Sequence, residues 1–197
     1  MLFNSLAFAI FLPVVFLLYW YVFKKSVKVQ NGLVLVASYF FYGLWDWRFL
    51  FLILASTLVD YYVGIQIGKN ADKPRLKKQW LWLSIVFNLS LLGFFKYYNF
   101  FTDSFIDLFE ILGYTIKSTW TLQIILPVGI SFYTFQTMSY SLDIYYKRIK
   151  PTKDFLSFAT FVAFFPQLVA GPIERASNLL GQITQKRIVH IPQITSG

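Results

Sequence analysis

Hydrophobic residues in this chain gather in long runs that are separated by short polar stretches. Six apolar segments are expected to be helical, at about 6–23, 31–45, 49–67, 80–101, 121–146 and 155–170. A helix needs roughly 20 predominantly apolar residues to cross the hydrocarbon core of a bilayer. A soluble domain of 197 residues could not bury so many apolar runs. The pattern therefore predicts an all-α, polytopic transmembrane protein that forms one domain over 1–197.

Two stretches depart from a plain spanning helix. Pro13 removes a backbone donor inside the first apolar run, so the first helix is expected to break or kink there. The stretch 102–119 carries Asp103, Asp107 and Glu110 along one helical side. It is expected to form an amphipathic helix that lies at the membrane interface rather than crossing the bilayer.

The distribution of charge predicts how the chain is oriented. Charged residues make up only 14% of the sequence, and the net charge is +9. Basic residues gather in three short loops, around 24–28, 69–78 and 147–153. Basic loops between spans usually face the cytoplasm, which places the N-terminus outside. This clustering argues for a membrane protein and against a nucleic-acid-binding surface. The first apolar run lacks a cleavage pattern and is expected to stay as a span.

The stretch FVAFFPQLVAGPIER, residues 161–175, interrupts the sixth apolar segment. Pro166 removes a helical hydrogen bond, and Gly171-Pro172 ends regular structure. Broken backbone at membrane depth is tolerated where protein or a wet cavity satisfies the freed groups. The stretch therefore predicts a broken or re-entrant segment that lines a polar space, with a plain helix end at the surface as the alternative. The polar residues that it would contribute are Gln167, Glu174 and Arg175.

The fifth apolar segment carries a stripe of polar side chains. Tyr133, Gln136, Tyr140 and Asp143 stand at i, i+3, i+7 and i+10, which places them on one helical face. Such a stripe on a spanning helix must face the interior of a helix bundle or a wet path. Two interpretations stay open: the stripe makes hydrogen bonds between helices, or it lines a substrate tunnel.

Asp60 is a further ionisable residue inside a predicted span, in STLVDYYVG. It is expected to be buried and to form hydrogen bonds with a neighbouring helix. Lys96 on the fourth segment is the nearest candidate counter-ion, but its predicted depth is too shallow for direct pairing. We expect Lys96 to extend toward the outer surface instead.

No set of residues within the chain predicts catalysis or metal binding. The chain has no cysteine, which excludes disulfides, thiolate metal sites and a cysteine nucleophile. The single histidine, His190, lies in a basic stretch outside any predicted span, and no second histidine, carboxylate cluster or Ser/His/Asp set supports it as a catalytic base. We therefore predict no catalytic residue, no metal and no tightly bound cofactor in these residues.

Several long strings resemble one known family, the membrane-bound O-acyltransferases, in their bacterial alginate O-acetylation branch. The strings are LPVGISFYTFQTMSYSLDIYY (126–146), FFPQLVAGPIERA (164–176), SYFFYGLWDWRFL (38–50), STLVDYYVG (56–64) and FFKYYNFF (94–101). The resemblance covers nearly the whole chain. It implies a ring of membrane helices around a central tunnel, in a bacterial inner membrane protein.

The resemblance also implies an activity. Family members transfer an acyl group, most often acetyl, onto hydroxyls of an exported polysaccharide. The donor would be acetyl-CoA or an acyl carrier thioester on the cytoplasmic side, and a separate periplasmic transferase would complete delivery to the polymer. The family's catalytic histidine lies in a Trp-His context that this sequence lacks, and His190 does not match it. The chain therefore resembles the N-terminal portion of a member, and we expect it to be inactive alone.

Two other classes of function remain as alternatives. A transporter or channel would also use broken helices with polar faces, but it usually carries an internal repeat, and the sequence shows none. A non-catalytic membrane scaffold that docks a periplasmic acyltransferase would need no catalytic residue at all.

Overall fold

The computed structural model describes residues 5–112, 124–127 and 129–187, and every element in these ranges is helical. The chain begins with α1 (Leu6–Leu17), which runs into a short π-helical turn, η1 (Leu18–Val22). Three long helices follow: α2 (Val27–Asp46), α3 (Arg48–Lys69) and α4 (Pro74–Ile111). The remaining helices are shorter: α5 (Ile130–Tyr145), α6 (Phe155–Val162), α7 (Phe165–Ala170) and α8 (Ala176–Thr184). The all-α prediction is confirmed for these residues.

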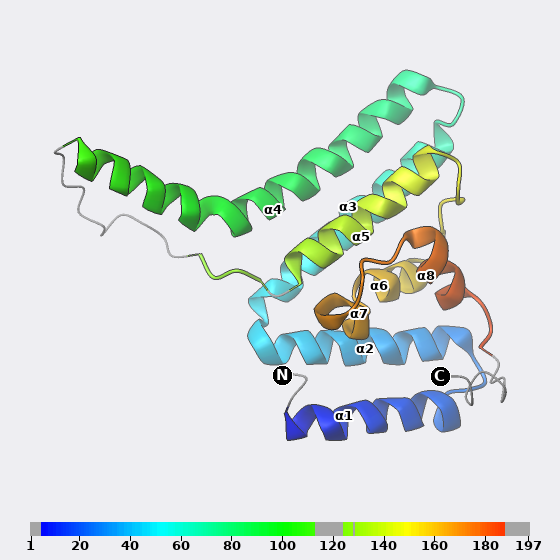
Figure 1. The fold of residues 1–197 in the computed structure, drawn as a ribbon. Coiled ribbons are helices and arrows are strands. Elements are labelled where there is room, and N and C mark those ends of the chain that lie inside the picture. The colour runs from blue at the N-terminus through cyan, green and yellow to red at the C-terminus, as the bar shows by residue number, and fades with distance from the viewer. Residues whose placement is uncertain (1–4, 113–123, 128, 188–197) are drawn as a thin grey trace.

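The helices form two packed groups that share α3 and α5 (Figure 1). Helices α3, α4 and α5 pack against one another, while α6 packs against α2, α3 and α8. The core between the groups is made of large side chains such as Tyr133, Tyr140, Phe158 and Phe161, each at most 1% exposed. Helix α1 lies at the edge beside α2, and none of its side chains is buried.

Local sequence signals explain where several helices begin. Ser5 caps α1 by accepting a hydrogen bond from the Phe8 amide, and Asp154 caps α6 in the same way from the Leu156 amide. Pro74 occupies the first turn of α4, where its missing N–H costs nothing. Gly129 precedes α5 with a φ of 79°, a left-handed conformation that glycine adopts without strain.

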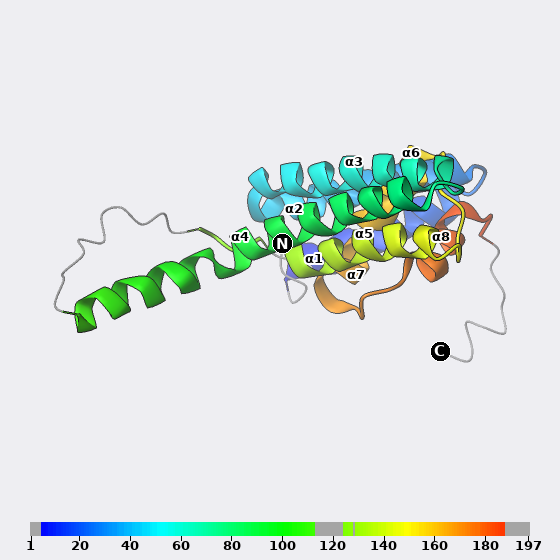
Figure 2. The ribbon, with the colours of Figure 1, turned by 90° about the horizontal axis from the view of Figure 1, so that it is seen from above.

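Two predicted boundaries were wrong, and the first helix is not broken at Pro13. Helix α1 continues through Pro13, and the irregular turn comes later, at η1. The predicted boundary near 101 is absent, because α4 runs unbroken to Ile111 and its second half projects away from the bundle (Figure 2). The fifth helix begins at Ile130 instead of about 121, since Gly129 sets its start. The rest of the amphipathic stretch, from 113 to 119, lies outside the described residues.

Two helices of the described part are long and apolar enough to cross a membrane, α3 and α4, with mean hydropathies of 1.7 and 1.3. Shorter apolar helical stretches cover Leu6–Val22 and Phe155–Leu168. The chain reversals that follow η1, α3 and α5 lie at the same end of the bundle (Figure 1). The three basic stretches of the sequence belong to these reversals, so positive charge gathers at one end. We call it the basic end.

Candidate functional site

The polar stripe of α5 is buried among its neighbouring helices. Tyr133, Gln136, Tyr140 and Asp143 are between 0% and 2% exposed. Each side chain therefore faces protein, on the face that the spacing of the stripe predicted. Whether the stripe lines a tunnel stays a prediction, because these side chains are packed against other helices in this structure.

Gln136 contacts the broken stretch directly. Its Nε2 donates to the Phe161 carbonyl oxygen at 2.5 Å and to Oε1 of Gln167 at 3.3 Å. Gln167 in turn donates from its Nε2 to the Pro172 carbonyl oxygen at 3.2 Å. Two of the predicted site residues, distant in sequence, are thus joined into one chain of hydrogen bonds that spans the break.

The backbone at the break accounts for this arrangement. Helix α6 ends at Val162, and α7 begins at Phe165 with Pro166 in its first turn. In a continuous helix the Phe165 amide would donate to the Phe161 carbonyl. Instead, the Phe165 amide donates to Oγ of Ser38 on α2 at 3.3 Å, and Gln136 satisfies the Phe161 carbonyl. Side chains from two other helices therefore replace one helical hydrogen bond, so the buried backbone groups at the break keep partners.

Additional polar atoms lie buried around the start of α5. The hydroxyls of Tyr42, Tyr133 and Thr134 and the Oε1 of Gln136 have no hydrogen-bond partner among the described residues. A Cβ on Gly129 would lie 3.8 Å from the Tyr42 hydroxyl and 3.1 Å from the carbonyl oxygen of Leu168. Tyr42 therefore reaches the junction between α5 and α7. Buried polar atoms are nearly always paired, so this junction has hydrogen-bonding capacity to offer to a ligand.

The far end of the stripe has a structural role. The Asp143 carboxylate accepts from Nη1 of Arg148 at 3.3 Å and from the Ser177 amide at 3.2 Å, at the start of α8. The Tyr140 hydroxyl accepts from the Thr152 amide at 3.1 Å in the loop before α6. These contacts hold the α5–α6 loop and α8 against α5.

Glu174 and Arg175 do not join the stripe. Glu174 is half-buried and accepts from Nδ2 of Asn178, one turn along α8, at 2.7 Å. Arg175 is exposed at the N-cap of α8, where its carbonyl oxygen accepts from the Asn178 amide at 3.0 Å. Both residues stabilise the beginning of α8, and a role in a tunnel wall stays a prediction.

Asp60 is fully buried and is the centre of a hydrogen-bond network that joins three helices. Its Oδ1 accepts from the hydroxyls of Ser84 and Ser141, and its Oδ2 accepts from Nδ2 of Asn88 at 2.6 Å. The Oδ1 of Asn88 accepts from Thr137 at 3.2 Å and from Ser56 at 3.3 Å. Asp60 is therefore buried and hydrogen-bonded to two neighbouring helices. Sequence reasoning missed Ser84 and Asn88, although their spacing of four residues places them on one face of α4.

Lys96 does not pair with Asp60. It is exposed on α4, with its Nζ 5.5 Å from the centre of the Tyr97 ring. Among the described residues no group of three or more histidine, aspartate or glutamate side chains could hold a metal ion. His190 lies outside the described residues.

Comparison with known proteins places this geometry in context. No family model and no solved structure matches the chain. The chain is 38% identical over 187 residues to the "Probable alginate O-acetylase AlgI" of Pseudomonas aeruginosa, and 37% identical over 187 residues to that of Azotobacter vinelandii. It is 36% identical to the "Peptidoglycan O-acetyltransferase" of Helicobacter pylori over 214 aligned residues.

Each of these alignments covers 94% of this chain but only 35%, 36% and 39%, respectively, of the relative. The chain therefore spans little more than a third of the length of the proteins that it matches. The resemblance expected from the sequence is confirmed: over nearly its whole length, this chain is similar to part of bacterial proteins named for O-acetylation of alginate and of peptidoglycan.

Proposed function

We propose that this chain is the N-terminal part of a membrane-bound O-acyltransferase that moves an acyl group, most often acetyl, toward hydroxyls of an exported polysaccharide. The observation that carries this proposal is the similarity of 94% of the chain to relatives named for O-acetylation of alginate and of peptidoglycan. Both named acceptors are extracellular polymers with free hydroxyls, which supports an exported, hydroxyl-bearing polymer as the acceptor.

The proposed location is the bacterial inner membrane, crossed several times, with the N-terminus outside. The apolar helices α3 and α4 and the gathering of basic stretches at one end support it. With the basic end facing the cytoplasm, an acetyl-CoA or acyl carrier thioester would approach there, and a periplasmic transferase would receive the acyl group at the opposite end.

The junction of α5 with α6 and α7 would form part of the wall of the acyl passage. Gln136 donates hydrogen bonds to the broken backbone and to Gln167. The hydroxyls of Tyr42 and Tyr133 lie nearby and have no hydrogen-bond partner in the described part. These groups can orient a carbonyl or a hydroxyl. An alcohol also needs a general base to attack a thioester near neutral pH. We expect that base to come from a residue outside this chain.

A chimeric enzyme tests the proposal. The 187 residues of the Pseudomonas aeruginosa relative that match this chain would be replaced by their counterparts here, and alginate acetyl-ester content would be measured in cells that lack the native protein. We expect acetylation to be restored. We also expect Gln136→Leu to lower it by about tenfold or more, because the Phe161 carbonyl and the Gln167 amide lose their partner.

Gln79→Leu is the matched control, since Gln79 is exposed on α4 and should leave acetylation unchanged. Protein level would be measured in parallel, so that lost acetylation is not confused with lost expression. An abundant, membrane-inserted chimera that leaves alginate unacetylated would contradict the proposal. If that chimera instead increased solute flux in proteoliposomes, the transporter alternative would replace it.

A further inference from the structure

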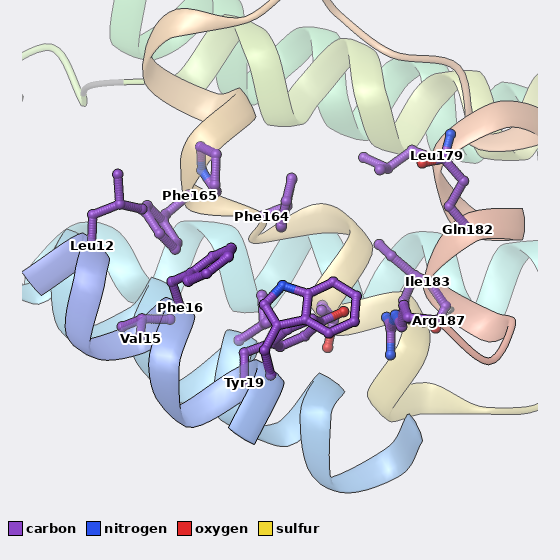
Figure 3. A pocket seen from close by; sticks show the side chains of 14 residues that line it. Leu12, Val15, Phe16, Tyr19, Phe164, Phe165, Leu179, Gln182, Ile183 and Arg187 are labelled. Carbon is purple, nitrogen blue, oxygen red and sulfur yellow. Dashed lines mark hydrogen bonds between the residues drawn. The ribbon is translucent and has the colours of Figure 1, made fainter. Parts of the chain in front are cut away.

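A groove outside the polar site runs between α1 and the rest of the molecule (Figure 3). Its volume is about 310 Å³, at the lower end of the roughly 300–1,000 Å³ of small-molecule sites. One wall comes from α1 and η1, including Leu12 and Phe16, and the other from the α6–α7 junction and α8, including Phe165 and Leu179. Almost all of its lining is therefore hydrocarbon.

One charged group lies at the end of this apolar groove. Arg187, which follows α8, is half-buried and lines the groove near Tyr19, whose ring centre is 5.5 Å from the guanidinium carbon. Its Nη2 donates to Oδ1 of Asn31 at 2.6 Å and to the Ile183 carbonyl at 3.0 Å. Its Nη1 is 3.4 Å from Oε1 of Gln30.

All of these acceptors are neutral. The ion pairs found among the described residues, Asp46 with Arg48 and Asp143 with Arg148, do not involve Arg187. Burial lowers the pKa of the Arg187 guanidinium, because water is displaced from the charge. A half-buried cation whose partners are all neutral is available to pair with an anion from outside the described part of the chain.

The position of the groove in the molecule indicates which kind of anion it would bind. Arg187 lies at the basic end, close to the start of α2 and its exposed lysines, Lys24, Lys25 and Lys28. The cytoplasmic leaflet carries anionic lipids, which are drawn to basic segments at its surface. An apolar groove that ends at a guanidinium matches a molecule with a hydrocarbon chain and an anionic head group.

We propose that this groove binds one acyl chain of an anionic phospholipid, with the lipid phosphate on Arg187. The groove shares Phe165 and Pro166 with the α6–α7 break, but neither Gln136 nor Gln167 lines it. The inference rests on the membrane location proposed above. The bare phosphate ion is a poor fit because the lining is apolar, and a zwitterionic lipid is a weaker fit because its head carries a cation beside the phosphate. Arg187 would give the site its preference for net negative charge.

The test is a lipid titration of the purified protein in detergent micelles. Short-chain phosphatidylglycerol and phosphatidylcholine with brominated acyl chains would be added, and quenching of tryptophan fluorescence would be recorded. Trp20 lines the groove and reports its occupation. We expect saturable quenching at lower concentration with phosphatidylglycerol than with phosphatidylcholine, and loss of the saturable part in Trp20→Phe.

Three variants separate the contributions of charge and groove. Arg187→Gln should weaken phosphatidylglycerol binding by about tenfold, the loss of one charge-assisted contact, and leave phosphatidylcholine unchanged. Lys186→Gln, at the exposed neighbouring cation, is the control and should change neither. Val15→Phe fills the groove from the α1 side without adding a tryptophan to the readout, and should weaken both lipids.

Equal affinity for the two lipids in the native protein would overturn the proposal. So would full competition by inorganic phosphate together with unaltered lipid binding in Val15→Phe, since this result would describe an ion site that holds no acyl chain. The outcome is independent of acyl transfer, because the chimera experiment measures acetyl esters, whereas this one measures lipid occupancy.

Discussion

At the scale of single residues, a few buried polar side chains hold the helices of this protein together through hydrogen bonds. Asp60 shows the principle most clearly. A carboxylate that is removed from water is costly unless donors surround it, and Ser84, Asn88 and Ser141 supply these donors from two other helices. The network therefore fixes the relative positions of α3, α4 and α5 at one depth.

Replacing Asp60 by alanine should strongly destabilise the protein. The substitution removes the acceptor of three buried hydrogen bonds, and we expect a loss of about 2–5 kcal/mol in the free energy of unfolding. The measurement is unfolding of the purified protein in detergent, followed by circular dichroism. Asp107→Ala, at an exposed position of α4, serves as the control and should have little effect. Similar curves for the two variants would show that the network is dispensable.

At the scale of elements, α3 and α5 approach so closely that one glycine is required. A Cβ on Gly64 would collide with the Tyr140 ring and lie 3.0 Å from Cδ1 of Ile144. Both are buried side chains that have little room to move. Small residues at such crossings are typical of membrane helices, because they let the backbones come together.

Alanine substitutions at two glycines should therefore change the stability of the protein in opposite directions. Gly64→Ala should destabilise the protein by about 1–3 kcal/mol through overpacking. Gly93→Ala, in α4, adds a Cβ that meets nothing within 4 Å and should stabilise that helix by up to about 1 kcal/mol. Thermal unfolding midpoints of both variants would be compared with the native protein. A lower midpoint for Gly93→Ala than for Gly64→Ala would contradict this account of the α3–α5 contact.

The break between α6 and α7 is also a property of elements. Pro166 signals in the sequence that the helix cannot continue normally, but it does not say where the helix ends. The structure ends α6 three residues earlier than α7 begins, and Ser38 and Gln136 supply the missing backbone partners. Ser38 could not be predicted, because a serine in an apolar run on another helix has no local signal that links it to this break.

At the scale of the whole molecule, the proposed orientation can be tested because the chain has no native cysteine. Trp47, between α2 and α3, and Lys73, between α3 and α4, are both exposed and lie at opposite ends of α3. In intact spheroplasts, Trp47→Cys should react with a membrane-impermeant maleimide. Lys73→Cys should react only after the cells are permeabilised.

The labelling pattern distinguishes the alternatives. Reaction at both positions in intact spheroplasts would contradict a membrane crossing by α3, and the reverse pattern would place the basic end outside. Labelling after denaturation serves as the control for the reactivity of each cysteine. The same variants would report whether the groove near Arg187 lies at the cytoplasmic leaflet, as the lipid proposal requires.

The sequence by itself determined what local chemistry controls. Apolar periodicity gave the helical class, the spacing of Tyr133, Gln136, Tyr140 and Asp143 gave a shared face, and Pro166 gave a break. Only the tertiary structure decided which groups meet. It brought Asn88 to Asp60, Ser38 and Gln136 to the two sides of the break, and Arg187 to the end of an apolar groove. The spacing of residues along a helix fixes the direction in which each side chain leaves the helix axis. Which residue that side chain contacts depends on how helices that are distant in sequence pack together.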